Sequence, residues 1–306
     1  MTAGKVLVVV VVFWFVRHTI FEAVEQLAEH PLRLRPGWLV AAAGIYLLGL
    51  LPAGLFWHRL LVTLGQDASF GETLRAYYIG HLGKYVPGKA MVVVIRAGLI
   101  RSRRVNTGVA AASVFYETLT MMSVGALLAA GVLAVWFREH VFLCLVAVGL
   151  MVAAGLPILP PVFRRLAKFA RIGRSDPLIA EKLERLGVGT LLLGVGAMVI
   201  CWLLLGISLW AVLQAMGVED IDLAVNLPLY VASVSLAMVA GFLSLIPGGA
   251  VVRELVLTEL IAPHLGVAVA LASAVLLRLV WLGSELVISG ILYVIRPRKG
   301  RFSSEE

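Results

Sequence analysis

The sequence predicts an all-α membrane protein: a polytopic bundle of transmembrane helices with two opposed hairpins, each broken at Pro-Gly. The first observation is composition, because 61% of the 306 residues are hydrophobic, only 14% are charged, and the mean hydropathy is +0.98. Soluble globular domains are much more polar. The second observation is a repeated pattern at 80–88 and 241–248: Gly-x-Leu, two or three residues, Val or Ile, and then Pro-Gly. Together they predict a helical membrane domain with two interrupted helical segments.

The long elements follow from the apolar runs in chain order. Most runs approach or exceed the roughly 20 residues that a helix needs to cross the hydrocarbon core. The first run is short and has no small-residue cleavage site, so we expect an uncleaved first helix rather than a removed signal peptide. The polar stretch 164–186 is expected to be a loop with one amphipathic helix. The runs cover approximately 5–16, 37–58, 107–137, 141–163, 187–218, 223–246 and 265–295.

The distribution of charge predicts the topology. Eight of the 26 Lys and Arg residues lie between Arg59 and Arg104, seven lie within 164–185, and four more lie in the C-terminal tail. The loop 217–226 has no Lys or Arg and carries three acidic residues. Because cytoplasmic loops collect Lys and Arg, the basic regions and both termini are expected inside and the acidic loop outside. Arg35 then falls outside, together with Arg17 and Arg33, which the rule does not favour.

This topology places the two Pro-Gly segments as an inverted pair. The segment 67–104 starts and finishes inside, whereas 223–264 starts and finishes outside. The arms 71–83 and 88–100 are too short to span, which favours a re-entrant hairpin. We therefore expect one domain, 1–306, with inverted halves at approximately 37–137 and 187–295, linked by a helix at 141–163 and the basic loop 164–186. Interrupted segments at matching places in two halves are typical of transporter binding sites.

Charged residues at membrane depth mark a candidate binding site. Such charges are costly in lipid, so they normally face the bundle interior, a partner or water. Cations in a polar cavity would suit a phosphate-bearing head group, which Arg binds through its planar fork. Alternatively, the lysines snorkel to the surface, and the acid-base pairs only neutralise each other between helices. The residues are Lys84, Lys89, Arg96, Glu117, Arg253, Glu254, Glu259, Arg278 and Glu285.

The Pro-Gly turns themselves are further candidates for ligand contact. A helix that begins after Pro-Gly presents free amides and a positive dipole end to an anion. Glycine also lets the backbone approach a ligand closely. We therefore expect Pro87, Gly88, Pro247, Gly248 and Gly249 to line one cavity, approached from opposite faces of the membrane.

No catalytic or cofactor motif accompanies these residues. The sequence has no Walker-type phosphate loop and no His-Glu-x-x-His pair, and we expect no cofactor and no metal. The histidines at 58, 81 and 264 are isolated, so each is expected to be a hydrogen-bonded surface or interface residue. Cys144 and Cys201 lie in separate apolar runs and are expected to be buried thiols. A nucleic-acid partner is excluded because no exposed basic domain is present.

Tyr77–Arg96, with Leu-Gly-Lys-Tyr-Val-Pro-Gly-Lys at its centre, and 247–254, a Pro-Gly-Gly turn ending in Arg-Glu, are two distinctive motifs. They resemble the signature and the second motif of the lysylphosphatidylglycerol synthase transmembrane-region family, which is flippase-like. Ser113–Glu117 resembles a third element, and Arg278 its final-helix arginine. The chain departs from the family pattern at Val251, where the family often has Gly, and at Thr118, Thr120 or Met121, and Leu277. The candidate substrate-binding set is Lys84, Tyr85, Pro87, Gly88, Lys89, Arg96, Glu117, Pro247, Gly248, Gly249, Arg253, Glu254 and Arg278.

The resemblance implies a function that stays an expectation at this point. It implies a translocator in the bacterial cytoplasmic membrane that moves a phospholipid or lipid-linked head group between leaflets, without the cytosolic synthase domain. The expected partners are this lipid, and a separate lipid-modifying enzyme or a second copy of the chain. Two other classes remain open: a membrane-embedded lipid transferase, or an accessory subunit of a cell-envelope enzyme. The transferase would depend on Glu117 or Glu254, whereas a structural subunit would tolerate loss of the hairpin charges.

Overall fold

Within the described residues, helices are the only regular elements apart from one isolated bridge between Ser102 and Val105. The structure is a computed structural model, and it describes residues 34–86, 90–102, 104–136, 141–169, 177–218, 221–244, 246, 249 and 251–295. The expected first helix and the basic C-terminal tail lie outside these residues. The α-helices are α2 (Pro36–Thr63), α3 (Phe70–His81), α4 (Ala90–Ile100), α5 (Thr107–Trp136), α6 (Val141–Gly155), α7 (Pro160–Phe169), α8 (Pro177–Leu183), α9 (Val188–Ala215), α10 (Leu223–Leu243), α11 (Val252–Leu265) and α12 (Val267–Val294).

Five of these helices, α2, α5, α9, α10 and α12, are long and apolar enough to cross a membrane. The predicted helical membrane bundle is therefore confirmed, and the chain is a multi-pass membrane protein. One predicted element is different: the run 141–163 is divided into α6, a 3₁₀ turn at Leu156–Ile158, and α7. The reason is Pro157, which cannot donate a helical hydrogen bond, followed by Pro160, whose fixed φ favours the start of a new helix.

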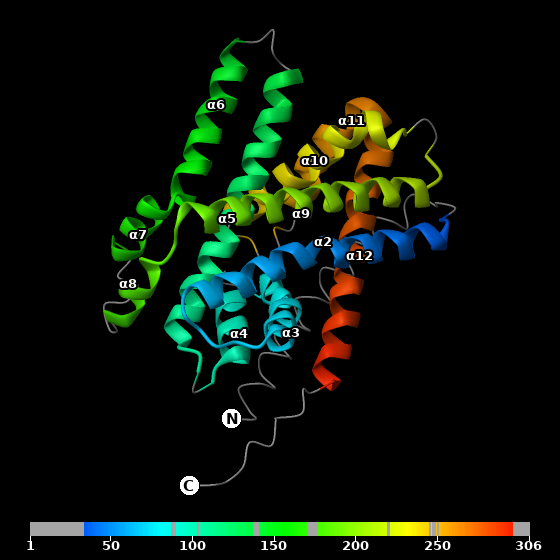
Figure 1. Ribbon diagram of the computed structural model, residues 1–306. Coiled ribbons are helices and arrows are strands. Elements are labelled where there is room, and N and C mark those ends of the chain that lie inside the picture. Colours follow the sequence, from blue (N-terminus) through cyan, green and yellow to red (C-terminus); the bar gives the residue numbers. More distant parts are fainter. Residues whose placement is uncertain are drawn as a thin grey trace.

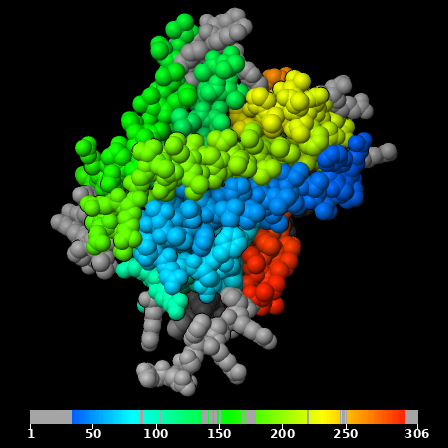
Figure 2. All heavy atoms as spheres, in the orientation of Figure 1, coloured from blue at the N-terminus to red at the C-terminus, as the bar shows by residue number. Residues whose placement is uncertain are grey.

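Helices α2 and α9 pack side by side in opposite directions along one face of the molecule (Figures 1 and 2). The contacts run along their whole length. The Arg35 amide donates to Ala215 O over 2.8 Å at one end, and Ser208 Oγ donates to Ala42 O over 2.9 Å nearer the middle. Gly194 of α9 lies against the Phe56 ring of α2. Small residues at these crossings let the two backbones approach closely, as is usual between membrane helices.

Other helix contacts connect the two halves of the sequence. The short helix α3 packs on α12, and in matching fashion α10 packs on α5 (Figure 1). Within each half, α3 and α4 pack together and α4 contacts α5, while α10 and α11 pack together and α11 contacts α12. Each hairpin is therefore held between the last helix of its own half and the last helix of the other half.

The two ends of the bundle carry different loops. At one end, the Asn106 amide donates to Gln66 Oε1 over 2.7 Å, and Ile179 of α8 lies against Gly108, so the basic segments before α5 and around α8 are neighbours. At the other end, Arg35 lies beside the last turn of α9 and the loop that follows it. A cation is favourable near a helix C-terminus, which accounts for Arg35 on the side where the charge rule predicts acidic residues.

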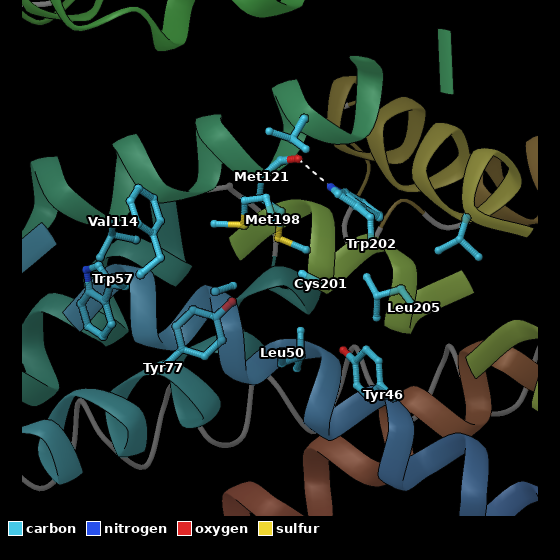
Figure 3. Packing of buried hydrophobic residues seen from close by; sticks show 14 of the residues in the cluster. Tyr46, Leu50, Trp57, Tyr77, Val114, Met121, Met198, Cys201, Trp202 and Leu205 are labelled. Atoms are coloured by element: carbon cyan, nitrogen blue, oxygen red, sulfur yellow. Dashed lines mark hydrogen bonds between the residues drawn. The ribbon is translucent and has the colours of Figure 1, made fainter. Parts of the chain in front are cut away.

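Large aromatic side chains fill the centre of the bundle (Figure 3). Trp202 of α9 is fully buried, and its Nε1 donates to Met121 O of α5 over 3.0 Å. Gly125 leaves room for the Trp202 ring, because a Cβ there would come within 2.5 Å of it. Many apolar side chains along α2 and α9, such as Leu48 and Leu192, point outward instead. An apolar exterior around a packed core is what a lipid environment favours.

Candidate functional site

The first hairpin is formed by α3 and α4, with a short 3₁₀ turn at Leu82–Tyr85 between them. Ser69 caps α3, because its Oγ accepts from the Glu72 amide and donates to the Glu72 carboxylate. The helices have 12 and 11 residues, so each extends only about 16–18 Å. The predicted Pro87-Gly88-Lys89 turn falls in the gap between them, and these three residues lie outside the described part.

The second hairpin is formed by α10, of 21 residues, and α11, of 14 residues. Pro247 and Gly248 lie outside the described residues, whereas Gly249 and Val251 are described, with φ angles of 65° and 66°. A β-branched residue is strained in this left-handed region, where glycine is not. Val251 therefore occupies a position that suits the glycine often found there in the family that the sequence resembles.

A glycine lies against an arginine in both hairpins. A Cβ on Gly80 would collide with the side chain of Arg96, and a Cβ on Gly241 or Gly249 would collide with that of Arg253. The glycine that opens each sequence motif thus makes room for the arginine of its own hairpin. This accounts physically for the shared Gly-x-Leu start of the two patterns.

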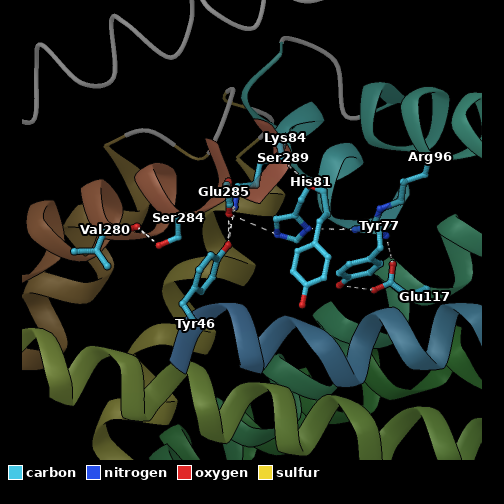
Figure 4. Close-up of polar contacts among 11 residues, drawn as sticks. Tyr46, Tyr77, His81, Lys84, Arg96, Glu117, Val280, Ser284, Glu285 and Ser289 are labelled. Carbon is cyan, nitrogen blue, oxygen red and sulfur yellow. Dashed lines mark hydrogen bonds and ion pairs between the residues drawn. The ribbon is translucent and has the colours of Figure 1, made fainter. Parts of the chain in front are cut away.

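The arginine of the first hairpin is paired inside the bundle. Arg96 Nη1 lies 2.7 Å from Glu117 Oε2 of α5, and the two side chains are only 2% and 1% exposed. The guanidinium carbon lies 4.0 Å from the centroid of the Tyr77 ring, and the Tyr77 hydroxyl donates to Glu117 Oε1 over 3.5 Å. Arg96 and Glu117, two of the charged residues predicted from the sequence, are therefore partners in one buried ion pair (Figure 4).

Lys84 forms a second ion pair that crosses from one half to the other. Its Nζ lies 2.5 Å from Glu285 Oε1 of α12, and the Tyr46 hydroxyl of α2 donates to the same oxygen (Figure 4). Tyr46 also stacks on Trp281, with ring centroids 4.5 Å apart, and the Arg253 guanidinium lies over the Trp281 ring at 5.7 Å. Lys84 of the first hairpin and Arg253 of the second are thus connected through α2 and α12.

His81 lies between these two ion pairs. Its Nδ1 is 3.2 Å from Arg96 Nη2, and its Nε2 is 3.9 Å from Glu285 Oε1. His81 is hydrogen-bonded, as expected, but its side chain is buried rather than on the surface, and it belongs to a buried charged network.

A third ion pair belongs to the second half. Arg278 Nη1 of α12 lies 2.6 Å from Glu254 Oε1 of α11, and the side chains are 8% and 13% exposed. Here the hairpin supplies the acid and the long helix supplies the base, the reverse of Arg96 and Glu117. Arg278 and Glu254 line a small pocket together with Arg253 and Trp281.

The two hairpins border one cavity of about 460 Å³. Among its described lining residues, the charged ones are Lys84, Arg96, Arg253 and Glu117, so cations predominate, and His81 and Gly249 also reach it. The remaining walls are mostly apolar. They come from both halves and include Val86, Val92, Val93, Val94, Phe115, Met121, Met122, Met238, Phe242 and Ile246.

Some predicted residues lie elsewhere, and some residues at the site were not predicted. Tyr85 is buried against Leu282, with its ring 5.1 Å from Lys84 Nζ, and does not line this cavity. Tyr46, Tyr77 and His81 were not predicted as site residues, because a tyrosine or histidine in an apolar run gives no sign of its partner. Within the described residues there is no group of three His, Cys, Asp or Glu side chains that could hold a metal ion.

Comparison with known proteins identifies a family for this chain. A family model described as the lysylphosphatidylglycerol synthase TM region matches residues 1–287. A comparison with curated proteins finds no match.

Proposed function

Since the chain belongs to the lysylphosphatidylglycerol synthase transmembrane-region family, we propose that it moves a lipid with an anionic head group between the leaflets of the membrane. The head group would bind in the cavity that the two hairpins share. The observation that carries this proposal is the cavity lining: three cations, Lys84, Arg96 and Arg253, and one carboxylate, Glu117, lie among otherwise mostly apolar walls.

The donors in the cavity suit a phosphate. Arginine binds phosphate through parallel N–H donors, and lysine binds it as a point charge. Nε of Arg96 is buried and has no hydrogen-bond partner among the described residues, although Nη1 is held by Glu117. A buried donor without a partner is costly, so an anion that accepts from Nε would be favoured.

The apolar walls suit the hydrocarbon part of the same molecule. Val94, Phe115 and Ile246 line the cavity and are also 58%, 48% and 43% exposed on the surface. The cavity therefore reaches the lipid-facing side of the bundle beside α4, α5 and the α10–α11 turn. A lipid could place its head group among the cations while its chains remain in the bilayer. A small soluble anion has no chains to place there, so the apolar opening favours a lipid.

The packing of the halves supports alternating exposure of this site. Two opposed broken hairpins on either side of a central site are typical of inverted-repeat transporters. Here α3 packs on α12 while α10 packs on α5, so a movement of either hairpin changes a contact with the opposite half. We propose that the hairpins are re-entrant and that they open the cavity to one leaflet at a time.

Exchange of a fluorescent lipid in vesicles tests the proposal. Phosphatidylcholine vesicles with a trace of fluorescent phosphatidylglycerol would be reconstituted with the protein, and a membrane-impermeant quencher would report the outer fraction over time. Arg253→Gln should slow exchange by about tenfold or more, since a buried charge-assisted contact contributes about 1.5–3 kcal/mol. Arg104→Gln is the matched control, because Arg104 is 70% exposed and pairs with Asp67 at the surface.

Two results would contradict the proposal. One is wild-type protein that exchanges the lipid no faster than empty vesicles. The other is Arg253→Gln protein that exchanges the lipid as fast as both wild type and Arg104→Gln. Exchange would then not depend on this cavity cation.

A further inference from the structure

The imidazole of His81 lies next to one member of each of two ion pairs, Arg96–Glu117 and Lys84–Glu285. Arg96, which faces Nδ1, belongs to the pair with Glu117, and Glu285, which faces Nε2, belongs to the pair with Lys84 (Figure 4). His81 lies in the first half and Glu285 in the second. A change in the charge of His81 would therefore act on both halves at once.

The chemistry of arginine fixes the protonation of His81 in this arrangement. A guanidinium is always charged and can only donate, so Nδ1 must accept from Arg96 Nη2. The imidazole is consequently neutral, with its single proton on Nε2, which faces Glu285 Oε1.

The groups around His81 oppose a second proton as long as the cavity holds no anion. Burial of the ring opposes its charged form most strongly, and Lys84, Arg96 and Arg253 add electrostatic repulsion from the 3₁₀ turn at Leu82–Tyr85, α4 and α11. The carboxylates nearby are already engaged, since Glu285 binds Lys84 and Glu117 binds Arg96. The other titratable neighbours are Tyr77, on the same helix with ring centroids 5.8 Å away, and Tyr46 of α2, which acts through Glu285.

From this geometry we infer that His81 binds a proton when an anionic head group binds, so that lipid and proton are taken up together. The inference rests on the proposed function. A phosphate among Lys84, Arg96 and Arg253 would cancel their electrostatic repulsion of a protonated imidazole. The proton would come from water through the cavity, which His81 lines, and would bind to Nδ1. By linkage, protonation of His81 must then strengthen anion binding by the same factor.

The proton also rearranges the two ion pairs so that Arg96 and Lys84 become available to the anion. A protonated Nδ1 can no longer accept from Arg96, so that guanidinium turns to the anion. The positive ring meanwhile attracts Glu285, whose buried Oε2 has no hydrogen-bond partner among the described residues. Glu285 then shifts from Lys84 toward His81, and Lys84 becomes available to the phosphate. A proton gradient could supply the energy for transport through this step.

Calorimetric titration tests the inference by counting protons. Short-chain phosphatidylglycerol would be titrated into detergent-solubilised protein in two buffers with different heats of ionisation, between about pH 8 and about pH 6. Wild type should take up a measurable fraction of a proton, at most about one, per lipid. Its affinity should rise as the pH falls, by at most about tenfold per pH unit.

The histidine variants locate the proton. His81→Gln should show no uptake and an affinity that does not change with pH, whereas the matched control His264→Gln, at an exposed position on α11, should behave as wild type. If the His81→Gln protein is not monodisperse, His81→Asn takes its place and the same results are expected.

The outcomes separate this inference from the proposed function. Wild type that binds the lipid without proton uptake overturns the inference and leaves the proposed function standing. Uptake that persists in the His81 variant assigns the proton to another group and also overturns it. Wild type that does not bind the lipid at all contradicts the proposed function, and the inference falls with it.

Discussion

The two hairpins use the same plan with the charges exchanged. In the first, the hairpin supplies Arg96 and the following long helix supplies Glu117; in the second, the hairpin supplies Glu254 and the following helix supplies Arg278. The first pair is almost inaccessible and is covered by the Tyr77 ring, whereas the second is partly open beside a small pocket. The first pair therefore holds its hairpin firmly, and the second hairpin can separate from its helix at lower cost.

The two hairpins differ in the expected cost of separation because their ion pairs differ in how far they are removed from water. Breaking a buried ion pair by removing one partner costs about 3–5 kcal/mol, because the other charge is left buried. Where water reaches the charges, both the cost and the gain are smaller. Accordingly, we expect the second hairpin to be the one that moves during transport.

The largest effect is expected for Glu117→Gln. The change leaves the guanidinium of Arg96 in the bundle with a neutral partner, so the protein should lose about 3–5 kcal/mol of stability. Thermal unfolding in detergent measures this loss of stability, with the decrease of the monodisperse peak as the readout. The double variant Arg96→Met with Glu117→Leu should regain most of the loss, since neither charge of this pair remains buried. A double variant as unstable as Glu117→Gln would contradict the argument.

A smaller effect is expected for Glu254→Gln. The pair with Arg278 is more exposed, so the loss of stability should be about 1–3 kcal/mol, below that of Glu117→Gln measured in the same way. The rate of lipid exchange should also change, because we expect this pair to close the hairpin that moves. Equal losses of stability in the two variants would remove the distinction between the hairpins.

The smallest effect is expected at Val251, and it should be an increase in stability. Val251 has a φ of 66°, so Val251→Gly relieves a backbone strain of about 1–2 kcal/mol, partly offset by the greater freedom of glycine in the unfolded chain. The neighbouring Val252→Gly is the matched control, because Val252 opens α11 and glycine should destabilise that helix. If Val251→Gly lowers the unfolding temperature as Val252→Gly does, the strained turn is not a feature of the protein.

The sequence predicted the helical membrane bundle because hydropathy and length determine which segments can cross lipid. The breaks near 87 and 247 were also predicted, since Pro and Gly act locally on the helix. The pairing was not predictable. Arg96 and Glu117 lie on consecutive helices, and the sequence does not show that α4 packs on α5 so that these two side chains meet. Tyr46 and His81 were missed for the same reason, because their partners lie on other helices.

The proposed function requires that one cavity between the two hairpins holds the anionic lipid. Photocrosslinking can locate the lipid, using phosphatidylglycerol with a photoactivatable group close to the phosphate, in vesicles that contain the wild-type protein. Mass spectrometry should find the adducts on both hairpins, at 90–96 of α4 and at Met238 or Phe242 of α10, and excess unlabelled phosphatidylglycerol should suppress them. Adducts confined to the outward faces of α2 and α9, such as Leu48 and Leu192, would contradict the claim.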